Sequence, residues 1–208
     1  MTEGDVIEGG VDPLRFRETL GHYPTGVVLV TAIADDGEPV GMVVGTFTAV
    51  SLSPPLVAFL PRRDSRTFAR LRTADAFCVN VLAATQAWLC HRFTDPGVTD
   101  RFRDVPWTPA PSGAPIVEGG VAWIDCDYDA ITEGGDHYIV LGRVRDLRVV
   151  RDVPPLLFHK GGYGRFAPLA PAETLTAGAV DGVPPLDRTP PPSVDGTAGG
   201  RARSVPRA

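Results

Sequence analysis

The sequence predicts a mainly β protein, an antiparallel sandwich or barrel with small flanking helices. Short apolar runs rich in β-branched residues recur along the chain, and turn residues separate them. One of these runs, residues 121–131, alternates between two kinds of side chain with period two, which is the spacing of a half-buried strand. Several short strands with turn signals between them are typical of sandwiches and barrels.

Composition limits the classes of partner and compartment. The chain has 208 residues, of which 43% are hydrophobic, enough for one good-sized core or two small ones. A net charge of −5 argues against nucleic-acid binding, which usually needs a clustered basic face. The acidic first residues do not resemble a signal peptide, and no apolar run reaches the roughly 20 residues that span a bilayer. We therefore expect a cytoplasmic protein with no membrane association.

The cysteines and histidines do not indicate a metal site. The cysteines, Cys78, Cys90 and Cys126, form no CxxC pair, and the histidines have no ligand-type spacing. Reduced, buried thiols are expected, because an odd number of cysteines without paired spacing is typical of cytoplasmic proteins. No metal is predicted.

Composition shifts twice along the chain and indicates one folded unit. Residues 1–11 form a polar, Gly-containing arm, and residues 168–208 are rich in Pro and Gly and lack aromatic side chains. Such segments bury too little apolar surface to offset their chain entropy, so both are predicted to be disordered. The folded domain is expected at residues 12–167.

The predicted strands follow one another with short connections. The first five are residues 26–34, 40–52, 55–60, 76–82 and 121–131. The turn "TEGG" joins the last of these to residues 137–150, so these two strands are predicted to form a hairpin.

Within residues 121–131, one face carries small or apolar side chains and the other carries acids. Ala122, Ile124, Cys126, Tyr128 and Ala130 are expected to face the core, and Asp125, Asp127 and Asp129 to face water.

Three helices are predicted between the strands. The first begins at Pro13 after an N-cap at Asp12 and stops near Gly21. The other two are predicted over residues 64–75 and 83–93.

The start of the second helix combines hydroxyls with cations. Ser65 opens the helix, and Arg62, Arg63 and Arg66 surround it. Free backbone N–H groups at a helix N-terminus, together with guanidinium groups, suit a phosphate. An ordinary capped helix with solvated arginines is the alternative.

The segment "EGGDHYIVLGRV" places Asp136 and His137 directly before an apolar strand. Neighbouring residues on a strand point to opposite faces, so Asp136 is not expected to orient the ring of His137. We expect Asp136 to fix the turn and His137 to face a site; the alternative is a histidine that only completes a hairpin. Nucleotide-binding fingerprints and nucleophile elbows are absent from the sequence.

A series of segments in one order resembles the short-chain flavin reductase family. They run from about Phe16 to Phe166 and include "TFTAVSLSPPLV" followed at a distance by "GDHYIVLGRV". The resemblance implies an FMN-binding split β-barrel, a homodimer, and flavin bound near the subunit interface. It also implies NADH- or NADPH-dependent reduction of free FMN or FAD, with the reduced flavin supplied to a partner monooxygenase.

The resemblance also implies roles for individual residues. It places the flavin ring system against the segment 39–46, the flavin phosphate in the loop 60–66, and the nicotinamide beside His137, with a late "KGGYG" motif also on the dinucleotide. The implied cofactor-binding residues are Gly41, Met42, Val43, Gly45, Thr46, Pro61, Arg62, Ser65, Arg66, Lys160 and Tyr163. His137 is the implied catalytic residue.

The sequence departs from the family pattern at Gly45, where Ser or Asn is usual, and thereby loses a side chain that would hydrogen-bond the flavin ring. Two other functions stay open. One is a split-barrel flavoprotein that retains its flavin and acts on another small molecule, and the other is a binding module without catalysis.

Overall fold

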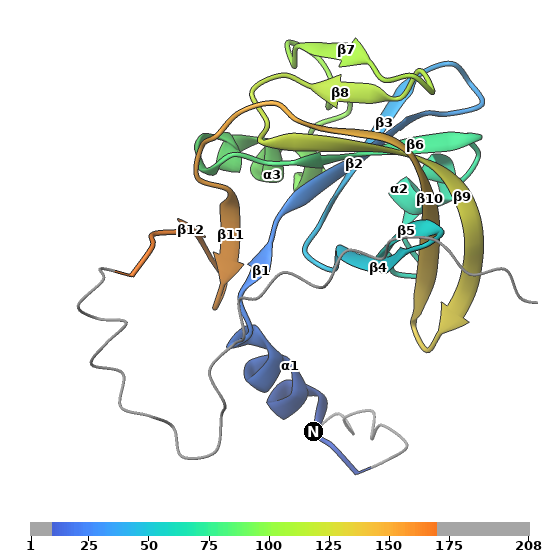
Figure 1. The fold of residues 1–208 in the computed structure, drawn as a ribbon. Helices are drawn as coiled ribbons and strands as arrows, with labels where there is room; N and C mark the ends of the chain where they lie inside the picture. The colour runs from blue at the N-terminus through green and yellow to red at the C-terminus, as the bar shows by residue number, and fades with distance from the viewer. Residues whose placement is uncertain (1–9, 170–208) are drawn as a thin grey trace, which may run out of the picture. The chain divides into compact units, whose positions relative to one another are not determined.

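The computed structural model describes residues 10–169, and these form a mainly β structure with antiparallel strand pairing (Figure 1). The fold class predicted from sequence is thereby confirmed. Residues 1–9 and 170–208, which hold nearly all of the predicted arm and tail, lie outside the described residues. Their disorder stays a prediction, as does the domain boundary at residue 167.

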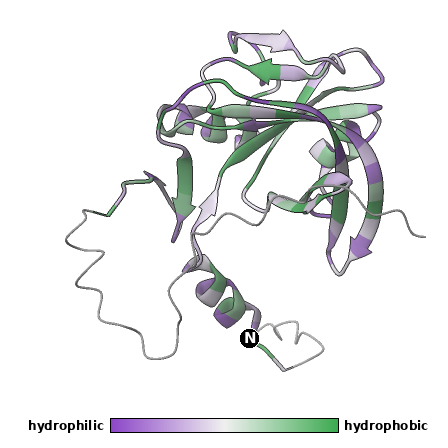
Figure 2. Ribbon diagram, in the orientation of Figure 1, coloured by the Kyte–Doolittle hydropathy of each residue, from purple (hydrophilic) through white to green (hydrophobic). Residues whose placement is uncertain are grey.

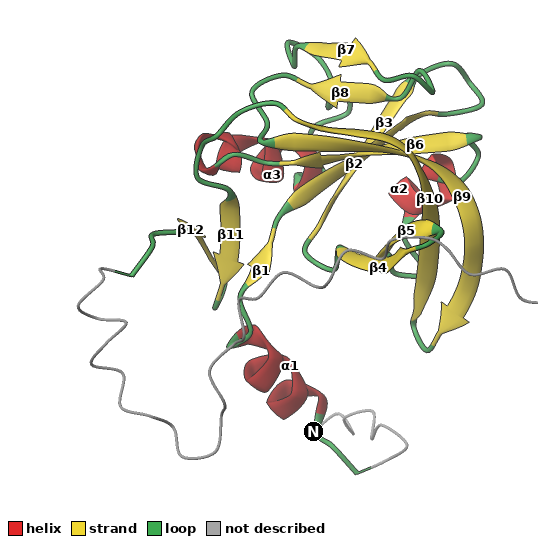
Figure 3. Ribbon diagram, in the orientation of Figure 1, coloured by secondary structure: helices red, strands yellow, loops and turns green. Residues whose placement is uncertain are grey.

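The helices are short and few beside the strands (Figure 3). They are α1 (Pro13–Gly21), α2 (Arg66–Leu71), the 3₁₀ turn η1 (Ala84–Gln86) and α3 (Ala87–Thr94). The strands are β1 (Thr25–Gly26), β2 (Val28–Ile33), β3 (Pro39–Val44), β4 (Thr48–Leu52), β5 (Pro55–Phe59), β6 (Ala76–Val81), β7 (Trp107–Pro109), β8 (Pro115–Val117), β9 (Ala122–Gly134), β10 (His137–Val149), β11 (Leu156–His159) and β12 (Gly162–Arg165).

The main sheet has seven strands in the order β3-β2-β6-β9-β10-β5-β4. Two smaller sheets, β1-β11-β12 and β7-β8, flank it. Figure 1 shows the main sheet strongly curved, with β9 and β10 as a long bent hairpin. Their pairing runs from His137↔Gly134 to Val149↔Ala122, which confirms the predicted hairpin.

The two edges of the main sheet are consecutive in the chain. β3 ends at Val44 and β4 begins at Thr48, so only residues 45–47 separate strands at opposite edges. Such a linker spans at most about 14 Å when fully extended. The sheet must therefore curl until its edges approach at this end. Within the described residues β3 and β4 are not paired with each other, so the barrel stays open along this seam.

Several predicted elements have different bounds in the structure. The single strand predicted over 40–52 is wrong, because the chain leaves β3 at Gly45 to reach the opposite sheet edge. The helix predicted over 64–75 is shorter and ends at Leu71. The short strands β7, β8, β11 and β12 were not predicted, because β7, β8 and β12 include prolines or glycines and β11 has only four residues.

The largest cluster of buried side chains joins the main sheet to α2. Phe59 of β5 packs edge-on against Phe68 of α2 and Phe77 of β6, with ring centroids 6.1 and 5.4 Å apart. Gly142 of β10 faces the ring of Phe77, where an added Cβ would lie 2.4 Å from Cζ. This packing fixes β10 against β5 and β6. Figure 2 shows that the β9–β10 hairpin becomes hydrophilic toward its tip, which the core does not cover.

The expected water-facing position of Asp125 is wrong. Its side chain is fully buried, because the loop before β8 covers this part of β9. The backbone N–H of Ser112 donates to Asp125 Oδ2 at 2.9 Å, and the Ser112 hydroxyl donates to Oδ1. The carboxylate thereby supplies hydrogen-bond partners that this loop needs in order to be buried.

Asp125→Ala should destabilise the fold more than Asp127→Ala, a matched change on the same strand. Removing Asp125 leaves the half-buried Ser112 N–H without its acceptor, at a cost of about 1–3 kcal/mol. Asp127 instead pairs with Arg145 at a partly exposed position, where solvent screens the interaction. Urea unfolding of both variants measures the difference. Equal midpoints would contradict a structural role for the buried carboxylate.

Candidate cofactor site

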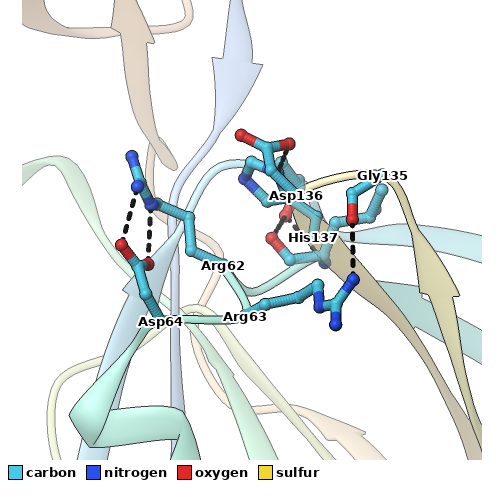
Figure 4. Close-up of polar contacts among 8 residues, drawn as sticks. Arg62, Arg63, Asp64, Gly135, Asp136 and His137 are labelled. Carbon is cyan, nitrogen blue, oxygen red and sulfur yellow. Dashed lines mark hydrogen bonds and ion pairs between the residues drawn. The ribbon is translucent and has the colours of Figure 1, made fainter.

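The loop after β5 continues the sheet alongside the start of β10. Tyr138 N–H donates to the Pro61 carbonyl at 2.8 Å, and Arg63 N–H donates to the Asp136 carbonyl at 3.0 Å. Arg62 and His137 form an isolated antiparallel bridge between these bonds. The pairing brings the predicted residues Pro61, Arg62 and His137 together (Figure 4). The ring of Pro61 is buried, so its carbonyl makes the contact.

His137 is held by its neighbour in the chain. Its Nδ1 lies 2.7 Å from Asp136 Oδ1. The expectation that Asp136 cannot orient this ring is wrong, because Asp136 lies in the turn and β10 begins only at His137. Strand alternation therefore does not separate the two side chains. The hydrogen bond to His137 is the largest cause that lowers the pKa of Asp136, with the charge of His137 second.

The three arginines of the predicted anion site differ in their partners. Arg62 forms a two-bond pair with Asp64, at 2.9 and 2.8 Å, and that hydrogen bonding lowers the pKa of Asp64. Arg63 reaches across to the hairpin, where its Nη2 lies 3.1 Å from Glu133 Oε1. For Arg66 the described residues provide no hydrogen bond or ion pair. Arg66 is therefore the guanidinium best able to accept an external anion.

Ser65, predicted to lie in the first turn of the second helix, is the N-cap of α2. Its hydroxyl oxygen accepts the Phe68 N–H at 3.2 Å. The hydroxyl keeps its own proton as a donor, so a ligand contact is compatible with the cap. The helix itself has only six residues, shorter than the sequence pattern indicates.

The linker at the barrel seam contacts structure on both of its sides. Leu60 N–H donates to Thr46 Oγ1 at 2.9 Å, which ties the linker to the loop that precedes Arg62. On the other side, a Cβ added to Gly45 would lie 2.7 Å from Thr25 Oγ1 of β1. The Thr46 hydroxyl is therefore engaged with the protein, and the exposed main chain around it is what the linker offers a ligand.

The β3 residues that were predicted to bind cofactor pack against the protein interior on their side-chain sides. Gly41 faces the ring of Phe93, where an added Cβ would lie 2.4 Å from Cε1. Met42 packs on the core cluster that contains Phe59, and Val43 packs on a second cluster that contains Phe93. Contact of these residues with a ligand through backbone groups stays a prediction.

Lys160 and Tyr163 lie on a different sheet from His137. Lys160 occupies the β11–β12 turn with φ 49°, and its N–H donates to the Gly21 carbonyl at 3.1 Å. Tyr163 packs edge-on against His91, with ring centroids 5.6 Å apart. Among residues 10–169, no hydrogen bond or ion pair joins these two residues to His137. The linker lies between the groups, because Thr25, which faces Gly45, pairs with Phe158 of β11.

The site has one half-buried imidazole, several guanidinium groups and no nucleophilic thiol. Cys78, Cys90 and Cys126 are free and buried, and burial raises the pKa of Cys126 to about 12. A thiol with so high a pKa is not ionised near neutral pH and does not attack a substrate. Thr25 and Glu133 were missed by the sequence reasoning, because they contact the site only through the fold and follow no motif.

Comparisons with known proteins identify the family. Residues 20–167 match the model of the flavin reductase like domain. The chain is 50% identical over 163 residues to a flavin reductase of Pseudomonas putida, covering 78% of this chain and 95% of that protein. It is 45% identical over 168 residues to HsaB, the reductase subunit of a flavin-dependent monooxygenase of Rhodococcus jostii, covering 80% and 84%.

A solved structure has the same fold. The NADH:FAD oxidoreductase SgcE6 of Streptomyces globisporus, solved with NAD and FAD fragments, superimposes with a TM-score of 0.70 at 40% identity, covering 76% of this chain and 96% of that one. This agreement and the family match cover the curved sheet, the linker, the loop 60–66 and His137. The chain therefore belongs to the flavin reductase family.

Proposed function

We propose that this protein uses NADH or NADPH to reduce FMN or FAD and passes the reduced flavin to a partner monooxygenase. The names of its relatives support this reaction, and one of them is a monooxygenase reductase subunit. The structural observation that carries the proposal is His137, an imidazole held by Asp136 at the rim of the open seam. The residues fit a flavin, since the linker 45–47 is partly exposed and Arg66 has no ion-pair partner among the described residues.

The two cofactors supply the hydride chemistry, and the protein has to align them. Because Nδ1 of His137 contacts the Asp136 carboxylate, that nitrogen carries a proton and Nε2 is left for a ligand. In the neutral ring Nε2 is an acceptor, which suits the amide N–H of a nicotinamide. Gly41, Met42, Val43, Gly45 and Thr46 would contact the flavin ring through backbone groups. Arg62, Ser65 and Arg66 would hold its phosphate, and Lys160 and Tyr163 would contact the dinucleotide.

The protein is also proposed to be a homodimer. Phe16, Leu20 and Tyr23 follow one another at helical spacing in and after α1, and they are 51%, 54% and 72% exposed. None of the residues of α1 is buried in the single chain. An apolar helix face left uncovered in this way fits burial against a second copy.

The partner and the compartment are proposals of the same kind. In the proposed reaction the reduced flavin leaves this protein, and an oxygenase component would receive it. The three cysteines are all free, which fits the reducing cytoplasm. The helices that the structure describes, with at most nine residues, are all too short to be bilayer-spanning segments.

NADH or NADPH oxidation by the purified protein should depend on added flavin. The absorbance at 340 nm should stay constant without flavin. It should fall, over many turnovers, when FMN, FAD or riboflavin is added. Flavin should behave as a saturable substrate. Tightly retained flavin with ping-pong kinetics toward another acceptor would instead support the alternative flavoprotein. No oxidation with any flavin would refute the proposed reaction.

His137→Ala should lower kcat/KM for the reduced nicotinamide by about 10- to 100-fold, the effect of losing one positioning contact. Flavin affinity should stay near that of the unmodified protein. Asp136→Asn keeps the shape of the turn but weakens the hold on Nδ1, so a smaller loss in the same parameter is expected. Steady-state kinetics and melting temperatures of both variants test this. Lowered melting temperatures with unchanged kinetics would show that the pair only completes the hairpin.

Phe16→Glu combined with Leu20→Glu should convert the protein to a monomer. The two acidic side chains would place charge in an interface that α1 otherwise fills with apolar groups. Light scattering after gel filtration gives the mass, and Arg17→Glu on the same helix is the control for the added charge. A dimer mass for the double variant would locate the interface elsewhere.

A further inference from the structure

A cavity of about 380 Å³ lies beside the site described above. Its walls come from β3, from α2 and from the loop 98–102. Its charged lining residues are Glu38, Arg66, Arg70, Asp100 and Arg101, and Gly41, Thr67 and Phe102 also line it. His137, Arg62 and Thr46 are not among the lining residues. The cavity is thus next to the barrel seam, and Gly41 of β3 and Arg66 belong both to its lining and to the proposed flavin site.

The cavity lining holds three arginines and two acids, Glu38 and Asp100, and neither acid forms an ion pair with an arginine among the described residues. Of its three arginines, Arg70 pairs with Asp36 at 2.7 Å. Arg101 donates from Nη1 to Thr67 Oγ1 at 3.3 Å and, like Arg66, has no carboxylate partner among the described residues. The acid closest to them in sequence, Asp100, accepts the Arg103 N–H at 3.0 Å within its own turn.

The loop that bears Arg101 is held in place from behind. Arg92 of α3 donates from Nε to the Arg101 carbonyl at 2.7 Å and from Nη2 to the Asp100 carbonyl at 3.3 Å. The same Nη2 also donates to the Arg103 carbonyl. One guanidinium thereby fixes three carbonyls of one turn, so the main chain that bears Arg101 is held in place before any ligand arrives. Ordering of this kind reduces the entropy that binding would otherwise cost.

We propose that this cavity binds the adenosine diphosphate end of FAD, and this rests on the proposed function. Guanidinium groups bind phosphate oxygens in pairs of hydrogen bonds, and Arg66 and Arg101 offer two such groups. The cavity volume lies within the range of small-ligand sites, about 300–1,000 Å³. Phe102, half-buried in the wall, offers an apolar ring edge for the adenine. FMN ends at the phosphate that Arg66 would hold and has no adenosine to fill the rest of the cavity, so FAD should bind more tightly than FMN.

Calorimetric titration of the full chain with FAD, FMN, riboflavin and ADP tests the assignment. FAD should bind the unmodified protein at least 10-fold more tightly than FMN, and ADP should compete with FAD but not with riboflavin. Arg101→Ala should weaken FAD binding by 10-fold or more and leave FMN and riboflavin within twofold. Arg103→Ala is the matched control, because Arg103 lies on the same loop outside the cavity lining and should change no affinity.

Several results would contradict either this assignment or the proposed reaction, and they can be told apart. Equal affinity of the unmodified protein for FMN and FAD, or ADP that fails to displace FAD, would overturn the assignment without using any variant. An Arg101→Ala protein with unchanged FAD affinity but a raised KM for NADH or NADPH would give the cavity to the reductant, which also overturns it. Tight, Arg101-dependent FAD binding in a protein that oxidises neither NADH nor NADPH would refute the proposed reaction and leave this inference standing.

Discussion

The three-residue connection between β3 and β4 is the constraint on which the rest of the molecule depends. It joins the two edges of a seven-stranded sheet, so the sheet can exist only in a curled form. Curling encloses Phe59, Phe68 and Phe77 and leaves a seam where the edges meet without pairing. Because the linker crosses that seam, its main chain is exposed where a barrel would otherwise be closed. The opening that a flat cofactor needs is thus a consequence of topology.

Polar contacts take over where the core ends. The hairpin tip at Gly135 lies beyond the apolar packing, so its position depends on Arg63, which reaches the Gly135 carbonyl and Glu133, and on main-chain bonds from the loop 61–63. Thr46 holds that same loop to the linker through Leu60. Linker, loop and hairpin tip therefore form one connected rim. A substitution in any of the three shifts the others, even where it touches no cofactor.

The sequence was informative where local pattern and burial agree. Strand alternation, the Asp12 and Ser65 caps and the β9–β10 hairpin were all predictable, since each depends on neighbours in the chain. Asp125 was placed on the wrong face because a distant loop covers it, and no local pattern records that cover. The orientation of His137 by Asp136 was missed because side chains alternate between the two faces only within a strand, and β10 begins at His137. The roles of residues in cofactor binding were inferred from the family resemblance. The structure shows which of their polar groups already hydrogen-bond within the protein.

A side chain at position 45 would compete for space with the side chain of Thr25 in β1. The resemblance to the family leads one to expect Ser or Asn here, and glycine gives the linker no side-chain hydrogen-bonding group at this position. In the structure the Thr25 hydroxyl lies 2.7 Å from the point that a Cβ of residue 45 would occupy. A side chain at 45 therefore requires the Thr25 hydroxyl to turn away, while the main chain of Thr25 is held by its pairing with Phe158 of β11. Positions 25 and 45 are coupled through this contact, so a hydroxyl stands beside the linker although residue 45 itself has none.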